Sequence, residues 1–202
     1  MVMFSPEDFA ASLEAEIRDL PAGFYDTFQY TRTGNNLAHP ITIGVICRLL
    51  LKRDSGLRLA LDLRLNEGHL KFQPDIAVLS PHLDPLLYVD YESPNSSDAR
   101  VPSKDIEAYS SWVAGYHDAA PYFVITSLPD KPVPSWELRH TGKGQSNAEF
   151  AGPHRAAIHA EMRANPYRFW VRYYRSKVCR PLPSSISFLN IDGKNAQLLD
   201  LS

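Results

Sequence analysis

One short segment, Tyr122–Thr126, limits the possible folds of this chain more than any other. Its sequence, Tyr-Phe-Val-Ile-Thr, consists of aromatic and β-branched residues, which are typical of β-strands. Because the segment has no strongly polar face, we expect a strand that is buried on both sides, as in a sheet covered by helices. The segment therefore predicts a layered α/β or α+β architecture with a central sheet between helices.

Three helices are expected before or beside this sheet, at residues 5–20, 39–53 and 103–117. The first begins with Ser-Pro-Glu-Asp, in which the serine suits the N-cap, the proline suits the first turn and the acids suit the positive helix end. The second begins at His39-Pro40 and is apolar on nearly all sides, which indicates a helix packed against a sheet. Ser103 suits the N-cap of the third helix.

Three further strands are expected between the second and third helices. Leu57–Leu65 alternates leucine with more polar residues, a turn follows at Asn66-Glu67-Gly68, and His69–Leu79 and Pro85–Glu92 form the next two strands. The predicted order is helix, strand, strand, strand, helix, strand, which favours a central mixed β-sheet flanked by helices. Beyond residue 128 we expect an edge strand at 136–140, a helix at 154–165 and strands at 167–176 and 185–191.

Length and composition fit a single domain of ordinary globular character. The chain has 202 residues, and its net charge of −2 means that any nucleic-acid surface must be local. The two cysteines form no CxxC pair, which excludes a zinc ribbon or a redox motif. No run of about 18 apolar residues is present, so we expect no membrane partner and a reduced, cytoplasmic protein.

Three carboxylates occupy unusual places in these predicted strands. Asp75 precedes an apolar stretch, and Asp90 and Glu92 lie two residues apart on the next strand, so their side chains leave the same face. If the two strands are neighbours, three anions converge, and a cation or protons must compensate their repulsion. Oxygen ligands of this kind suit Mg²⁺ or Mn²⁺. The alternative is that these acids lie at strand ends, facing water or paired with arginine and lysine.

The same residues resemble a known family. Pro74-Asp75, followed after fifteen residues by Asp90-Tyr91-Glu92, resembles the PD-(D/E)XK signature of restriction-endonuclease-like nucleases. The longer pattern, Gln73–Val78 and then Val89–Pro94, resembles the Uma-two-type branch of that superfamily. That branch continues with a loop aspartate and a helical lysine and tyrosine, which are Asp98, Lys104 and Tyr109 here. His39 and its helix fit the same pattern, and the resemblance covers about residues 36–128.

The resemblance implies one domain over residues 1–202, with a restriction-endonuclease-like core at 36–128. Residues 1–35 would form an N-terminal helix and extension, and residues 129–202 a C-terminal α/β extension. Two positions depart from the superfamily pattern, because Glu92 stands where lysine is usual and Asp90 where glutamate is commoner. In the branch the lysine has moved to the helix, where Lys104 is the matching residue. The alternative for Lys104 is a solvated lysine in the first turn of a helix.

The chemistry that the resemblance implies is metal-assisted hydrolysis of phosphodiester bonds. Asp75 and Asp90 would hold Mg²⁺ or Mn²⁺, which polarises the phosphate and activates a water. Glu92 would be a further ligand or would orient that water as a base, and Lys104 would stabilise the charge that builds on the phosphate. The implied partner is nucleic acid, DNA in preference to RNA, and a homodimer is a habit of the superfamily.

A basic segment follows in the C-terminal part of the chain. Residues 154–180 hold seven arginines and lysines against one acid, interleaved with aromatic residues. We expect Arg168, Arg172 and Arg175 to contact phosphates, since basic and aromatic residues together suit nucleic-acid binding. The alternative is a sheet edge with arginines outward and aromatic residues inward.

Two functions from different classes follow from these observations. The first is a metal-dependent nuclease that uses Asp75, Asp90, Glu92 and Lys104. The second is a catalytically inactive restriction-endonuclease-like module that uses the same cleft for nucleic-acid or protein binding, since a fold does not guarantee an activity. Convergence of the four residues at one cleft favours the nuclease, and splayed carboxylates or a solvent-directed Lys104 favours the binding module.

Overall fold

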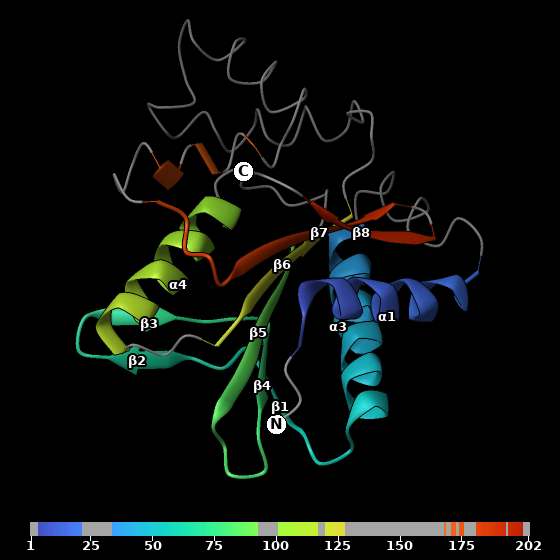
Figure 1. Cartoon of the computed structure of the whole chain (residues 1–202), viewed down its shortest axis with the longest axis horizontal. Helices are drawn as coiled ribbons and strands as arrows, with labels where there is room; N and C mark the ends of the chain where they lie inside the picture. The colour runs from blue at the N-terminus through green and yellow to red at the C-terminus, as the bar shows by residue number, and fades with distance from the viewer. Residues whose placement is uncertain are drawn as a thin grey trace, which may run out of the picture.

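A mixed six-stranded sheet forms the centre of the computed structural model (Figure 1). The structure describes residues 4–21, 34–92, 101–116, 120–127, 168, 171–172, 174–175, 181–192 and 194–199. The strand order is β1-β4-β5-β6-β7-β8. The strands are β1 (Arg58–Leu61), β4 (Ile76–Leu79), β5 (Pro85–Glu92), β6 (Tyr122–Thr126), β7 (Ile186–Asp192) and β8 (Asn195–Leu199). β5, β6 and β7 are parallel to one another, and the other pairs are antiparallel.

Helices cover both faces of this sheet, so the expected α+β layering with a central mixed sheet is confirmed. Helices α1 (Pro6–Arg18) and α3 (Gly34–Arg53) lie on one face, and α4 (Val101–Tyr116) lies on the other (Figure 1). The two faces bury separate hydrophobic clusters, one that includes residues of α1 and α3 and one that includes residues of α4. All five residues of β6 are buried, as its apolar sequence predicts.

Helix α1 forms where the sequence predicts it. The Ser5 hydroxyl accepts a hydrogen bond from the backbone N–H of Asp8 at 3.1 Å, which satisfies one of the free donors of the first turn. Phe9, Leu13 and Ile17 are all buried on the face toward the sheet. The predicted bounds of the other two helices need correction, because α3 begins at Gly34 rather than His39, and α4 begins at Val101, which places Ser103 inside the helix.

The predicted strands Leu57–Leu65 and His69–Leu79 are each divided in the structure. β1 ends at Leu61, since Asp62 has a φ of +50°, which an extended strand does not accommodate. A separate antiparallel hairpin follows, made of β2 (Leu65–Glu67) and β3 (Leu70–Phe72). Gln73-Pro74 then separates β3 from β4, because proline has no N–H to donate to a sheet.

The β2–β3 hairpin packs against α4, on the same side of the main sheet (Figure 1). Phe72 and α4's Ile106 and Tyr109 belong to one buried cluster. A side chain at Gly115 would meet Leu70 at 2.4 Å, so the hairpin lies close against the end of this helix. The hairpin therefore supports α4 in its place over β5 and β6.

The predicted strand at 167–176 is wrong. The described residues of this segment, namely Arg168, Val171, Arg172, Tyr174 and Arg175, are helical. Val171 and Tyr174 are three apart and buried, which is the helical spacing, whereas the alternation in the sequence suggested a period of two. The predicted strand at 185–191 is confirmed as β7, whereas β8 was not predicted. The segments predicted at 136–140 and 154–165 lie outside the described residues.

Among the described residues, no helix has both the length and the apolar character that crossing a membrane requires.

Candidate functional site

Asp75 and Asp90 are neighbours at the point where β4 begins beside β5. Asp75 comes immediately before β4, and the antiparallel register pairs Ile76 with Val89. The backbone N–H of Asp75 donates a hydrogen bond to Asp90 Oδ1 at 2.6 Å. In return, the backbone N–H of Tyr91 donates to Asp75 Oδ2 at 2.8 Å. These two reciprocal bonds hold both residues at the same end of the β4–β5 pair, inside the sheet.

Asp90 is the most enclosed of the candidate residues, with a relative exposure of 4 %. Its second oxygen, Oδ2, accepts a hydrogen bond from the hydroxyl of Tyr122 on the neighbouring strand β6. Burial raises the pKa of Asp90 well above its usual value, and the charges of Asp75 and Asp105 raise it further. The two hydrogen bonds act in the opposite direction but do not offset the burial.

His39 belongs to α3, and it approaches the site from the face of the sheet that α1 and α3 cover (Figure 1). Its Nε2 lies 3.0 Å from Asp75 Oδ2, and the ring lies near that of Tyr91 with 5.9 Å between centroids. The hydrogen bond to Asp75 is the main cause that raises the pKa of His39, and burial opposes it. His39 is therefore a partner that partly balances the charge of Asp75.

Glu92 lies two residues beyond Asp90 on the same face of β5, and it is partly buried. It forms a side-chain hydrogen bond with Asp105 of α4, a residue that the sequence patterns did not single out. Burial raises the pKa of Glu92 well above its usual value, followed by the charges of Asp105, Asp90 and Asp75. Four carboxylates therefore lie close enough for their charges to interact where β4, β5 and the start of α4 meet. These are Asp75, Asp90, Glu92 and Asp105.

Positive charge is scarce around Asp90 and Glu92. In the described part of the chain, no lysine or arginine forms an ion pair with Asp90 or Glu92. Lys104 lies in the first turn of α4, next to Asp105, and its side chain is exposed. Protons or an added cation can relieve the negative charge of these two carboxylates.

The donor chemistry of this cluster fits a hard divalent cation, since its side chains offer carboxylate oxygens. As the described side chains stand, no three histidine, cysteine, aspartate or glutamate residues form a group that holds one ion. Mg²⁺ does not require such a group, because it is usually bound by one or two carboxylates, several waters and the substrate's phosphates. Asp75 and Asp90 meet that smaller requirement, and Glu92 lies beside them.

The basic residues predicted to bind nucleic acid share one side of a helical segment. Arg168, Arg172 and Arg175 are exposed and are spaced by four and three residues, which places them on one helix face. Val171 and Tyr174 point the other way, into the hydrophobic cluster that also contains α4 residues. We call the side with Arg168, Arg172 and Arg175 the arginine face. It belongs to the same layer of the molecule as α4.

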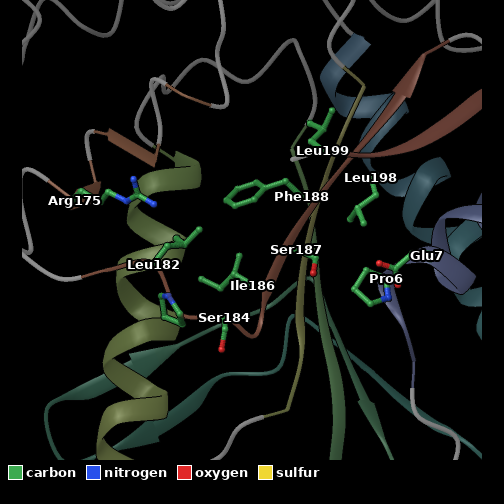
Figure 2. Close-up of a pocket in the computed structure, with 11 residues that line it drawn as sticks. Pro6, Glu7, Arg175, Leu182, Ser184, Ile186, Ser187, Phe188, Leu198 and Leu199 are labelled. Atoms are coloured by element: carbon green, nitrogen blue, oxygen red, sulfur yellow. The ribbon is translucent and has the colours of Figure 1, made fainter. Parts of the chain in front are cut away.

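A pocket at the end of β7 and β8 is separate from the carboxylate cluster (Figure 2). Figure 2 shows Arg175 reaching toward Phe188 over a lining that includes Leu182, Ile186 and Leu199. None of the four carboxylates lines it. The pocket is mostly apolar and offers no cluster of acids, so it is not the candidate metal site.

Comparisons with known proteins add no relative, because no family model, no curated protein and no solved structure matches this chain.

Proposed function

We propose that this protein is a metal-dependent nuclease that hydrolyses phosphodiester bonds of nucleic acid. One observation carries the proposal, namely the buried Asp90 within a cluster of four carboxylates and without a described lysine or arginine beside it. Clusters of this kind are costly in a folded protein unless they have a function, and strongly raised pKa values are concentrated at functional sites.

The order of elements around the site is in keeping with a restriction-endonuclease-like core. Helix α3 is followed by three antiparallel strands of the main sheet, β1, β4 and β5, and α4 then crosses to β6, which is parallel to β5. The β2–β3 hairpin is an insertion in this order. The pattern agrees with the resemblance of Asp75, Asp90 and Glu92 to the PD-(D/E)XK signature, and the assignment to that superfamily remains part of the proposal.

In the proposed reaction Asp75 and Asp90 would hold Mg²⁺ or Mn²⁺, and Glu92 would be either a further ligand or the base that orients the attacking water. A metal ion held by these residues would supply Lewis-acid polarisation of the phosphate and would favour ionisation of a water. As the base, the ionised form of Glu92 would accept the proton that the attacking water loses. His39 and the N–H of Tyr91 fix Asp75 in place. Lys104 balances the negative charge that builds on the phosphate.

The proposed substrate is nucleic acid, with DNA preferred to RNA. The exposed face of Arg168, Arg172 and Arg175 would contact phosphates along the strand, which positions the substrate without reading its sequence. A homodimer is part of the same proposal, because a second site would allow both strands of a duplex to be cut. Sedimentation of the purified protein measures the oligomeric state directly.

The test is incubation of the purified chain with linear and circular DNA and with RNA, in Mg²⁺, in Mn²⁺ and in EDTA. We expect cleavage that requires the metal and that is lost in Asp75→Asn purified in the same way. Glu16→Gln is the matched control, because it removes a buried carboxylate far from the cluster in sequence and fold. Equal cleavage by Asp75→Asn and the parent protein would show that the activity does not come from this site.

A second candidate is a catalytically inactive module that keeps the fold and binds nucleic acid. The exposure of Lys104 favours it, because the nuclease proposal requires this solvent-exposed lysine to reach a phosphate at the cluster. This alternative predicts nucleic-acid binding through the arginine face with no cleavage under any metal condition. Gel-shift and cleavage assays on the same preparation distinguish the two.

A further inference from the structure

Tyr122 is completely buried, and its hydroxyl is hydrogen-bonded to a candidate metal ligand. Tyr122 lies on β6, next to β5, with its hydroxyl donating to Asp90 Oδ2. The parallel register pairs Tyr122 with Tyr88 and Val124 with Asp90, so all four side chains share one face of the sheet. The position of the hydroxyl is therefore set by the main sheet and not by a loop.

The aromatic ring of Tyr122 is fixed by its neighbours. Its centroid lies 4.7 Å from that of Tyr109 on α4 and 5.6 Å from that of Phe72 on β3. These contacts are within the range of favourable aromatic packing, and they come from two different elements, α4 and β3. A ring held in this way cannot turn its hydroxyl from Asp90 without disturbing the packing of β3 and α4.

Both oxygens of Asp90 are engaged by donors, Oδ1 by the backbone N–H of Asp75 and Oδ2 by Tyr122. An ionised carboxylate has about four acceptor positions, so each oxygen keeps one lone pair after these two bonds. The carboxylate is thus fixed in one rotamer while it retains the capacity to bind a cation. Partners that orient a metal ligand in this manner commonly change metal affinity by about 10–100-fold when they are removed.

We propose that Tyr122 is a positioning residue for the metal site, which sets the orientation of the Asp90 carboxylate before an ion arrives. The inference rests on the proposed function, because it takes Asp90 to be a metal ligand. The competing explanation is structural: the hydroxyl of a buried tyrosine needs a partner, and Asp90 supplies it. The two explanations differ in what the hydroxyl does for metal affinity in a fully folded protein.

The experiment is calorimetric titration of Mn²⁺ into the parent chain, Tyr122→Phe and Tyr174→Phe, each shown to be folded by circular dichroism. Phenylalanine keeps the ring and its packing and removes only the hydroxyl. Tyr174 is the matched control, because it is buried in the same cluster and its hydroxyl has no hydrogen-bond partner among the described residues. We expect Mn²⁺ affinity about 10–100-fold weaker in Tyr122→Phe and unchanged in Tyr174→Phe.

Equal Mn²⁺ affinity in Tyr122→Phe and the parent protein would overturn the positioning role and leave the metal site intact. No Mn²⁺ binding by the parent protein would instead remove the proposed function, and the inference with it. If Tyr122→Phe does not fold, the near-ultraviolet tyrosine spectrum of the parent chain decides. Mn²⁺ should then perturb that spectrum, and the perturbation should be absent in Asp90→Asn; a bound ion with no tyrosine signal would contradict the role.

Discussion

Two buried carboxylates in this protein, Glu16 and Asp90, have opposite electrostatic surroundings. Glu16 lies between α1 and α3, where Arg48 Nε donates to it at 2.7 Å and Lys52 Nζ at 2.6 Å. The hydrogen bond from Lys52 is the main cause that lowers the pKa of Glu16. Asp90 is buried to a similar degree, but its side-chain partners are a tyrosine hydroxyl and a backbone N–H, and its pKa is raised.

The difference lies in whether a buried acid has basic partners within the described part of the protein. A buried charge that serves stability is compensated inside the protein, as Glu16 is by two cations. Asp90 has no lysine or arginine as an ion-pair partner in the described part of the chain, and it therefore keeps its capacity for an external cation. We therefore infer that Glu16 stabilises the packing of two helices, and we propose that Asp90 serves the metal site of the proposed function.

The largest expected effect concerns Lys104, which directly precedes Asp105 in the sequence of α4. If Lys104 balances the charge on the phosphate, Lys104→Ala should lower the rate of hydrolysis by roughly 10²–10³ and leave metal binding nearly unchanged. Lys71→Ala is the control, since Lys71 is also exposed but lies on β3. Single-turnover cleavage measures the effect. Cleavage by Lys104→Ala at the parent rate would assign the charge to a second ion or to an arginine.

Substitutions in the arginine face should have a smaller effect, and they should weaken binding to all nucleic-acid sequences equally. Replacing Arg168, Arg172 and Arg175 with glutamine should weaken binding to every nucleic acid and reduce the salt slope by about one for each phosphate that the variant no longer binds. The control variant changes Arg58, Arg64 and Lys71 to glutamine, which removes the same charge elsewhere. Equal weakening of nucleic-acid binding in both triple variants would show that the arginine face contributes only general positive charge.

Substitutions in the two regions should change stability in opposite directions. Glu16→Gln should lower the free energy of unfolding by about 1 kcal/mol, a modest figure because Arg48 and Lys52 are half exposed. Asp90→Asn should leave the metal-free protein equally stable or more stable, since it removes repulsion and the Tyr122 hydroxyl can accept from the new amide. Urea unfolding in EDTA measures both. A clear loss of stability in Asp90→Asn contradicts the assignment of Asp90 as an uncompensated acid.

The smallest expected effect concerns how the stability contributions of Glu16 and Asp90 change with pH, which should differ in sign. The pKa of Glu16 is lowered, so its contribution is present above the unfolded value of 4.5 and is lost as the pH falls through the lowered folded pKa. The pKa of Asp90 is raised, so the metal-free protein gains stability as the pH falls through that folded pKa toward 3.8. The free energy of unfolding of Glu16→Gln and of Asp90→Asn, each compared with the parent across pH, gives the slope that each carboxylate contributes. Slopes of the same sign would remove the distinction.

Much of the core was predictable because its patterns are long and local. The apolar strand Tyr122–Thr126, the cap at Ser5 and the strand Pro85–Glu92 each depend on neighbours in the sequence, and the structure has all three. The β2–β3 hairpin was missed because the leucine alternation continues beyond Leu61, whereas the backbone turns at Asp62. The helical segment with Val171 and Tyr174 was assigned as a strand because alternate aromatic residues also fit a period of two.

The candidate site was predictable only where it depends on adjacent strands. The juxtaposition of Asp75 and Asp90 follows from an antiparallel pair, and a two-residue spacing places Glu92 on the face of Asp90. Asp105 and Tyr122 could not be identified in this way. Asp105 depends on how α4 packs over the sheet, and Tyr122 depends on the parallel pairing of β5 with β6, which the crossover sets.

Whether the carboxylate cluster binds a metal can be measured by calorimetric titration of Mg²⁺ and of Mn²⁺ into the metal-free parent protein, Asp75→Asn, Asp90→Asn and Glu16→Gln. We expect a saturable site in the parent protein that is retained in Glu16→Gln and abolished in both aspartate variants. Unchanged affinity in the two aspartate variants, or no binding by the folded parent protein, would contradict the assignment of this cluster as a metal site.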